Sequence, residues 1–187
     1  MTRIVAGSAG GRRLRVPPSG TRPTSDRVRE ALFSALDARI DFDGVRVLDL
    51  YAGSGALGLE ALSRGAALAL LVESDRRAAT IVRGNIADLG LPGADLRVGT
   101  VAAVLEQGGA GPFDLVLSDP PYDVDTAAVV ADLTALAARG WLAAGALVVV
   151  ERSVRSPEIG WPTGYIASKA RKYGETRIEL AEYDPAV

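Results

Sequence analysis

The stretch Val47-Leu-Asp-Leu-Tyr-Ala-Gly-Ser-Gly-Ala-Leu-Gly58 decides the fold of this 187-residue chain. It begins as an apolar strand and runs directly into the pattern Gly-x-Gly-x-x-Gly, which opens a helix. Gly53 and Gly55 let backbone amides approach a ligand at the helix N-terminus, and Gly58 lets the helix pack closely on the strand. The stretch therefore predicts the first strand-turn-helix unit of a ligand-binding α/β sheet.

Short apolar segments alternate with helical patterns along most of the chain. The apolar runs predict strands over residues 45–50, 67–72, 96–98, 113–117 and 146–150. Between them, helices are predicted over 56–63, 75–89, 100–107 and 125–138. Because such alternation is typical of parallel strands joined by right-handed crossovers, we predict a doubly wound, Rossmann-like α/β fold.

The C-terminal part departs from this rhythm. After Glu151, two β segments at 165–168 and 176–183 have no long helix between them. They predict an antiparallel hairpin at the edge of a mostly parallel sheet, which would then have seven strands.

The N-terminal part also differs from the central pattern. Thr24 or Ser25 can cap a helix whose apolar residues recur every four positions, and the residues before Pro17 read as short strands. The chain is long enough for one core-bearing domain with a small appendage. We expect a short basic, β-rich extension over residues 1–23 and one main domain over 24–187.

Positive charge is concentrated at the N-terminus. The first thirty residues hold seven arginines against two acidic residues, a net charge of +5 in a chain whose total is −2, so the remainder carries −7. A smaller basic cluster near the C-terminus consists of Lys169, Arg171 and Lys172 beside Tyr173. A solvated surface is the ordinary explanation for either cluster, and it is the preferred explanation for the smaller cluster taken alone. The N-terminal asymmetry indicates a part of the surface suited to a polyanion.

Composition excludes several classes of chemistry. The chain has no cysteine and no histidine, which excludes disulfides, thiolate or imidazole metal sites, catalytic triads and cysteine nucleophiles, and we expect no metal. It has no apolar run long enough to span a membrane, and its first residues lack the hydrophobic core of a signal peptide. We expect a cytoplasmic protein that does not associate with membranes.

Two carboxylates at predicted strand ends indicate what the glycine turn binds. Glu73 closes the second strand, twenty residues after Gly53, where a carboxylate can accept hydrogen bonds from the ribose of an adenosine-containing cofactor. This fits NAD and S-adenosylmethionine equally. Asp49 favours S-adenosylmethionine, because it can contact the cationic amino-acid part and would repel a pyrophosphate. The candidate cofactor residues are Asp49, Tyr51, Ala52, Gly53, Ser54, Gly55, Glu73, Ser74, Thr100 and Val101.

The fourth predicted strand ends in Asp119-Pro120-Pro121-Tyr122. A Pro-Pro pair removes two backbone donors and fixes both φ angles, so the strand cannot continue and the direction of the following ring is restricted. Ligands of open α/β sheets gather at the carboxyl ends of the strands. We therefore expect this motif and the glycine turn to face one crevice.

Asp-Pro-Pro-Tyr after a glycine turn resembles the amino-group methyltransferases, which carry (Asn/Asp/Ser)-Pro-Pro-aromatic. The resemblance implies that Asp119 and the carbonyl of Pro120 accept hydrogen bonds from a target amine, and that Tyr122 stacks on the base. The candidate catalytic residues are Asp119, Pro120, Pro121 and Tyr122. An in-line methyl transfer needs positioning more than a protein nucleophile, which agrees with the missing cysteine and histidine.

Longer blocks resemble the RsmD family, and together they cover nearly the whole chain. They are Arg3-Ile-Val-Ala-Gly, Gly11-Arg-Arg-Leu, the block from Arg22-Pro-Thr to Phe33, and the block from Leu50 to Gly65. The chain departs from many relatives at Tyr51, where they have Phe, and at Thr100-Val101, which replaces a more polar pair near the expected adenine contact. The resemblance implies a class I S-adenosylmethionine-dependent methyltransferase, acting on a guanine N2 in the 16S RNA of the bacterial small ribosomal subunit or its assembly intermediate.

We therefore expect a monomeric rRNA (guanine-N2)-methyltransferase whose basic residues dock the RNA. The alternatives are a DNA adenine-N6 methyltransferase, an NAD-dependent oxidoreductase and a non-catalytic RNA-binding protein. The absence of a separate target-recognition region argues against the DNA enzyme, and Asp-Pro-Pro-Tyr argues against the oxidoreductase. The candidate RNA-binding residues are Arg3, Arg12, Arg13, Arg15, Arg22, Thr24, Arg27, Lys169 and Arg171.

Overall fold

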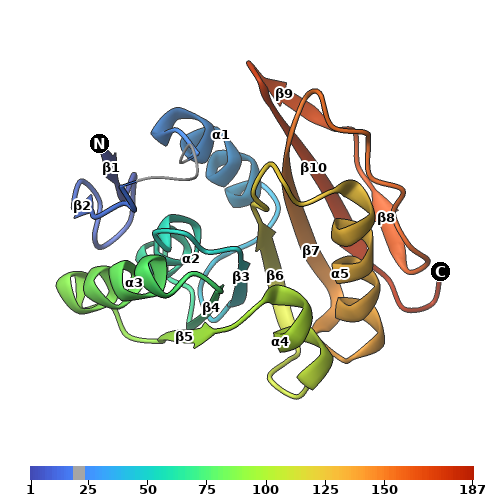
Figure 1. The fold of residues 1–187 in the computed structure, drawn as a ribbon, viewed down its shortest axis with the longest axis horizontal. Helices are drawn as coiled ribbons and strands as arrows, with labels where there is room; N and C mark the ends of the chain where they lie inside the picture. Colours follow the sequence, from blue (N-terminus) through green and yellow to red (C-terminus); the bar gives the residue numbers. More distant parts are fainter. Residues whose placement is uncertain (19–23) are drawn as a thin grey trace.

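The computed structural model describes residues 1–18 and 24–187. Its described part is built around one sheet in the strand order β5-β4-β3-β6-β7-β10-β8, with β9 also paired to β10 (Figure 1). The strands of this sheet are β3 (Arg46–Leu50), β4 (Leu68–Glu73), β5 (Ala94–Val98), β6 (Phe113–Ser118), β7 (Leu142–Ser153), β8 (Tyr165–Ala167), β9 (Arg171–Tyr173) and β10 (Thr176–Tyr183). The helices are α1 (Asp26–Asp37), α2 (Ala56–Ser63), α3 (Arg76–Leu89), α4 (Val101–Gln107) and α5 (Thr126–Ala138).

Strands β3 to β7 are parallel to their neighbours, and β10 is antiparallel to β7. This confirms the Rossmann-like α/β fold with antiparallel strands at one side. The C-terminal strands are more elaborate than expected. Strand β10 lies between β7 and β8, and the short β9 pairs with its first residues. The short β9, with which the described sheet has eight strands rather than the expected seven, was not predicted from the sequence.

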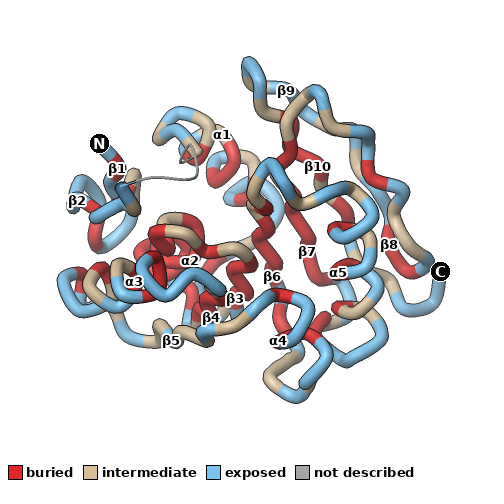
Figure 2. The backbone as a smooth tube through the Cα atoms, in the orientation of Figure 1, coloured by how far each residue is buried: buried red, intermediate tan, exposed pale blue. Residues whose placement is uncertain are grey.

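Alternate residues along the strands pack into two separate cores. Residues such as Val47 and Leu117 contribute to the core that includes α1, α2 and α3, and Leu48 and Val116 contribute to the core that includes α4 and α5. Helices therefore cover both faces of the sheet, and the central strands β3, β4, β6 and β7 are largely buried (Figure 2). By the same alternation, Asp119 follows Leu115 and Leu117 on the α1 face.

Side-chain caps fix where the helices begin. Ser25 caps α1 by accepting a hydrogen bond from the backbone N–H of Val28 at 3.2 Å, which decides between the two caps considered from sequence. Asp75, Thr100 and Asp125 cap α3, α4 and α5 in the same way. Helices α3, α4 and α5 directly follow β4, β5 and β6, so they begin at the carboxyl edge of the sheet.

The N-terminal residues form a two-stranded sheet, β1 (Thr2–Arg3) and β2 (Arg13–Leu14), which packs against α2 and α3. Ile4, Ala9 and Leu14 are buried in the core on the α1 face. The buried carboxylate of Glu60 accepts hydrogen bonds from the backbone N–H groups of Val5 and Ala6 at 2.8 and 3.0 Å. The first residues of the chain are thus part of the packed structure.

None of the helices in the described part of the chain combines the length and apolar character needed to cross a membrane.

Candidate active site

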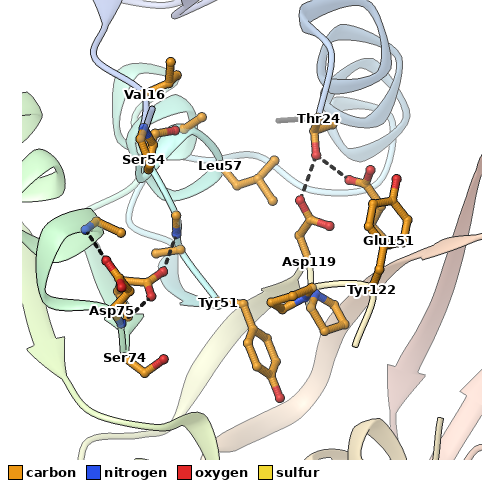
Figure 3. A pocket seen from close by; sticks show the side chains of 18 of the residues that line it. Val16, Thr24, Tyr51, Ser54, Leu57, Ser74, Asp75, Asp119, Tyr122 and Glu151 are labelled. Atoms are coloured by element: carbon orange, nitrogen blue, oxygen red, sulfur yellow. Dashed lines mark hydrogen bonds between the residues drawn. The ribbon is translucent and has the colours of Figure 1, made fainter. Parts of the chain in front are cut away.

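A cavity of about 460 Å³ opens at the carboxyl ends of β3, β4, β6 and β7 (Figure 3). The glycine turn and Glu73 form one part of its wall, and Asp119, both prolines and Tyr122 form another. Thr24, just before α1, also contributes. The structure therefore brings the two sequence motifs into one cavity, as their positions at strand ends suggested.

The turn after β3 depends on residues with left-handed backbone conformations. Tyr51 has φ 59°, which is unusual for a non-glycine residue, and Gly53 and Gly55 have φ 60° and 82°. A Cβ at Gly55 would lie 2.9 Å from the side chain of Leu71. The hydroxyl of Tyr51 donates a hydrogen bond to Asp132 on α5 at 2.5 Å, which anchors the strained residue.

Glu73 holds the glycine turn in place from the end of β4. Its Oε2 accepts a hydrogen bond from the backbone N–H of Gly53 at 2.7 Å, and its Oε1 accepts one from the backbone N–H of Asp75 at 2.8 Å. Each carboxylate oxygen can accept a further hydrogen bond, and Glu73 lines the cavity. The side chain can therefore support the turn and contact a ligand at the same time.

Asp49 lies behind the turn and does not line the cavity. Its side chain is buried and accepts a hydrogen bond from the backbone N–H of Gly58 at 2.9 Å. Burial raises the pKa of Asp49 to about 7. A Cβ at Gly58 would come within 3.1 Å of this carboxylate, which explains the glycine. In this structure Asp49 fixes the start of α2 from beneath, so a direct contact with a ligand stays a prediction.

The other candidate cofactor residues divide into two groups. Ala52, Ser54, Ser74 and Val101 line the cavity together with the residues above. Gly55 and Thr100 instead occupy the N-cap positions of α2 and α4. The side chain of Thr100 accepts a hydrogen bond from the backbone N–H of Ala103 at 3.2 Å. Of the Thr100-Val101 pair, only Val101 faces the cavity.

Asp119-Pro120-Pro121-Tyr122 leaves the sheet at the end of β6 and lines the cavity throughout. The ring of Tyr122 is 73% exposed, whereas most large apolar side chains of the described residues are buried. An exposed aromatic ring at the mouth of a cavity offers a flat surface on which another ring can stack.

A hydroxyl joins Asp119 to a second carboxylate that sequence reasoning missed. The Oγ1 of Thr24 lies 2.9 Å from Asp119 Oδ2 and 2.7 Å from Glu151 Oε2. Burial raises the pKa of Asp119 to about 6, and burial together with the charge of Asp119 raises that of Glu151 to about 8. The pairing of Ser118 with Val150 explains the proximity, because the next residue of each parallel strand then lies at the same edge.

The remaining wall comes from residues that were not among the candidates, most of them outside the two motifs. Cavity-lining residues that were not expected are Val16, Pro17, Pro18, Ala56, Leu57, Val72, Asp75, Arg77, Ala78, Asp123, Glu151, Arg152, Ser153, Ser156, Glu175 and Thr176. The segment after β7 is held by Arg177, whose guanidinium donates hydrogen bonds of 2.9 Å to the carbonyls of Ser156 and Pro157. This part of the wall could have been predicted only from the pairing register of β7 and β10, which the sequence does not show.

Several candidate RNA-binding arginines already have protein partners. Arg12 donates hydrogen bonds to the carbonyls of Leu89, at 2.9 Å, and Asp88 at the C-terminal end of α3. Ion pairs join Arg15 to Asp88 at 2.8 Å and Arg3 to Asp26 at 3.6 Å. Arg13, Arg27, Lys169 and Arg171 are exposed, and Arg22 lies outside the described residues.

The chemistry of the cavity suits a cationic ligand with hydroxyl groups. Its charged side chains are mostly acidic: Glu73, Asp75, Asp119, Asp123, Glu151 and Glu175, against Arg77 and Arg152. Such a wall disfavours a pyrophosphate and favours a ligand with positive charge. A sulfonium cofactor with an adenosine part fits these donors and acceptors.

Comparison with known proteins places the chain in a family. The family model "Conserved hypothetical protein 95" matches residues 2–182. The chain is 44% identical over 162 residues to ribosomal RNA small subunit methyltransferase D of Escherichia coli (strain K12), covering 86% of this chain and 78% of that protein. It is 38% identical over 161 residues to the protein of the same name from Haemophilus influenzae, covering 84% and 81%.

A solved structure agrees with these matches. The Escherichia coli protein yhhF superimposes with a TM-score of 0.88 at 36% identity, and the alignment covers 98% of each chain. The family match over residues 2–182 spans the glycine turn, the Asp-Pro-Pro-Tyr strand end and nearly all of the C-terminal strands. The chain therefore belongs to the RsmD family of methyltransferases.

Proposed function

We propose that this chain transfers a methyl group from S-adenosylmethionine to the exocyclic N2 of a guanine in 16S ribosomal RNA. The observation that carries the proposal is the shared cavity, in which Asp119-Pro120-Pro121-Tyr122 lies beside the glycine turn and Glu73. The names of the relatives, ribosomal RNA small subunit methyltransferase D, support RNA of the small subunit as the substrate.

The methyl donor would lie against the glycine turn. Glu73 would accept hydrogen bonds from the ribose hydroxyls, and Val101 would contribute an apolar surface for the adenine. When bound, S-adenosylmethionine supplies an electrophilic methyl group on a positively charged sulfur. The acidic wall, including Asp119, stabilises that charge at the side where the target enters.

The target guanine would be held by the strand end after β6. Tyr122 is free to stack on the base, because its ring is exposed at the cavity mouth. The Oδ2 of Asp119 is engaged by Thr24, which leaves Oδ1 to accept a hydrogen bond from the N2 amine together with the carbonyl of Pro120. Transfer leaves an extra proton on the amine, and Asp119 is the carboxylate placed to accept it.

RNA would approach over the basic N-terminal extension. Arg13 and Arg27 are exposed near the start of the chain, Lys169 is exposed between β8 and β9, and Arg171 is exposed at the start of β9. Phosphate contacts from such residues offset the repulsion between RNA and the acidic remainder of the chain.

One experiment separates this proposal from the alternatives. The protein is incubated with S-adenosylmethionine labelled in its methyl group and with unmodified small subunits, free 16S RNA or duplex DNA, and the labelled nucleotide is mapped. We expect label only on the N2 of a guanine in the RNA substrates. Label on DNA adenine supports the DNA enzyme, and no label on any substrate supports a binding protein.

A further inference from the structure

The unexplained feature of the cavity is the second carboxylate behind Asp119. Glu151 lies near the end of β7, and Asp119 directly follows the neighbouring β6, so the two residues lie side by side on the α1 face of the sheet. Thr24, which precedes α1, places its hydroxyl between them, and Figure 3 shows both contacts. Three separate segments of the chain converge on this contact.

The two contacts require a proton that the hydroxyl cannot supply alone. A threonine hydroxyl has one hydrogen to donate, and an ionised carboxylate can only accept. With both carboxylates ionised, one of the 2.7 and 2.9 Å contacts would bring lone pairs together. If one carboxyl group is protonated, it donates to Oγ1 of Thr24, whose own hydrogen goes to the other carboxylate.

Glu151 is the better site for that proton. Its contact with Thr24 is the shorter of the two, and the neighbouring charge of Asp119 adds to burial in raising its pKa. The other charged groups of the cavity wall are Glu73, Asp75, Arg77, Asp123, Arg152 and Glu175. The guanidinium of Arg152 is turned to the carbonyl of Val124, at 3.0 Å, so it does not neutralise Glu151.

We propose that Glu151 is a positioning residue, which holds a proton and, through the hydroxyl of Thr24, fixes Asp119 as an oriented anion. The donor chain runs from the Glu151 carboxyl group to Thr24 Oγ1, and from Thr24 to Asp119 Oδ2. Oδ1 of Asp119 then remains available to the target amine. This role rests on the proposed function for its catalytic consequence but not for the location of the proton.

The location of the proton is tested without substrate. Protein labelled with ¹³C at the glutamate side-chain carboxyl carbon is titrated by NMR, and the Glu151 signal is identified by its loss in Glu151→Gln. We expect this carboxyl to remain protonated through neutral pH. Ionisation in the ordinary glutamate range, with a pKa of about 4.3, would overturn the proposal.

Substitutions test the role in turnover. Glu151→Gln keeps a permanent donor toward Thr24, so kcat should stay within about threefold of wild type, whereas Glu151→Ala should lower kcat by about tenfold or more with little change in cofactor affinity. Thr24→Val should resemble Glu151→Ala, and Thr24→Ser should restore most of the rate. Glu158→Gln, an exposed site beyond β7, is the matched control and should behave as wild type.

The dependence of kcat on pH shows whether the protonated or the ionised form of Glu151 supports turnover. In wild type, kcat should fall as the pH rises through the pKa of Glu151, about 8, because the donor is lost and a second anion appears beside Asp119. Glu151→Gln should abolish this alkaline fall. If Glu151→Gln is as inactive as Glu151→Ala, the ionised carboxylate is the working form and the proposal is wrong. If Glu151 titrates as expected but wild type methylates no RNA, the proposed function fails and the proton assignment stands.

Discussion

At the scale of single residues, the exposed ring of Tyr122 should matter for target binding and little for stability. Its ring is 73% exposed, so Tyr122→Ala should cost little stability. The same change should weaken target binding by about 1 to 3 kcal/mol, because base stacking on an aromatic ring is lost. Tyr122→Phe keeps the ring and should be mild. Affinity for unmodified small subunits and thermal unfolding are the two measurements, and equal loss for Ala and Phe would contradict stacking.

Single residues also mark the limit of motif reasoning at this site. Asp119 and Glu73 could be found because each follows an apolar run and falls at a recognisable spacing. Glu151 follows an equally apolar run, but no motif surrounds it. Its role depends on the β6–β7 register and on Thr24, which is separated from Asp119 by 95 positions in the sequence. Contacts over such separations are decided by tertiary packing.

At the scale of elements, the N-terminal strands are joined to α1 and α2 by buried charges. Glu60 on α2 is fully buried and accepts hydrogen bonds from the backbone of residues 5 and 6 and, at 3.0 Å, from Arg64. Arg29 on α1 is equally buried, 3.6 Å from Glu60. Deleting the first sixteen residues would expose this network and the core beneath Ile4 and Leu14. The extension cannot be treated as a detachable arm.

Removing Glu60 tests this coupling of elements. Glu60→Ala removes one of the two acidic partners of buried Arg29, leaving only Asp26 at 2.8 Å, and takes away the acceptor of two backbone N–H groups. It should lower the free energy of unfolding by about 3 to 5 kcal/mol in urea titrations. The exposed pair of Arg139 and Glu106, at 2.6 Å, provides the control, because Glu106→Ala should cost no more than about 1 kcal/mol. Equal effects of the two substitutions would mean that the buried network does not join the N-terminal strands to the helices.

The elements themselves were largely predictable. Strand β3 and helix α2 follow from the run 47–58, because buried parallel strands are apolar throughout and glycine permits the left-handed turn. The central strands and α3 to α5 agree with the expected ranges to within a few residues, apart from the longer β7. The insertion of β10 between β7 and β8 was not predictable, since pairing order among antiparallel strands depends on long-range contacts that periodicity does not encode.

At the scale of the whole molecule, charge separation governs how RNA would approach. Arg13 and Arg27 are exposed on the N-terminal side, whereas the rest of the chain is acidic. Replacing both with Ala should flatten the slope of log affinity against log salt by about 0.7 to 0.9 for each lost phosphate contact. Arg139→Ala, on the α5 side of the sheet, is the control and should leave the slope unchanged. An unchanged slope in the double variant would place RNA docking elsewhere.

The central claim is that one cavity joins the methyl donor to a target amine held by Asp119. The most direct measurement combines nucleoside mass spectrometry of treated small subunits with calorimetric affinity for S-adenosylmethionine, for wild type and Asp119→Ala. The expected result is N2-methylguanosine from wild type, a loss of about 10²-fold or more in turnover for Asp119→Ala, and nearly unchanged cofactor affinity. A variant with near wild-type turnover, or a methyl group on another atom in the wild-type product, would contradict the account.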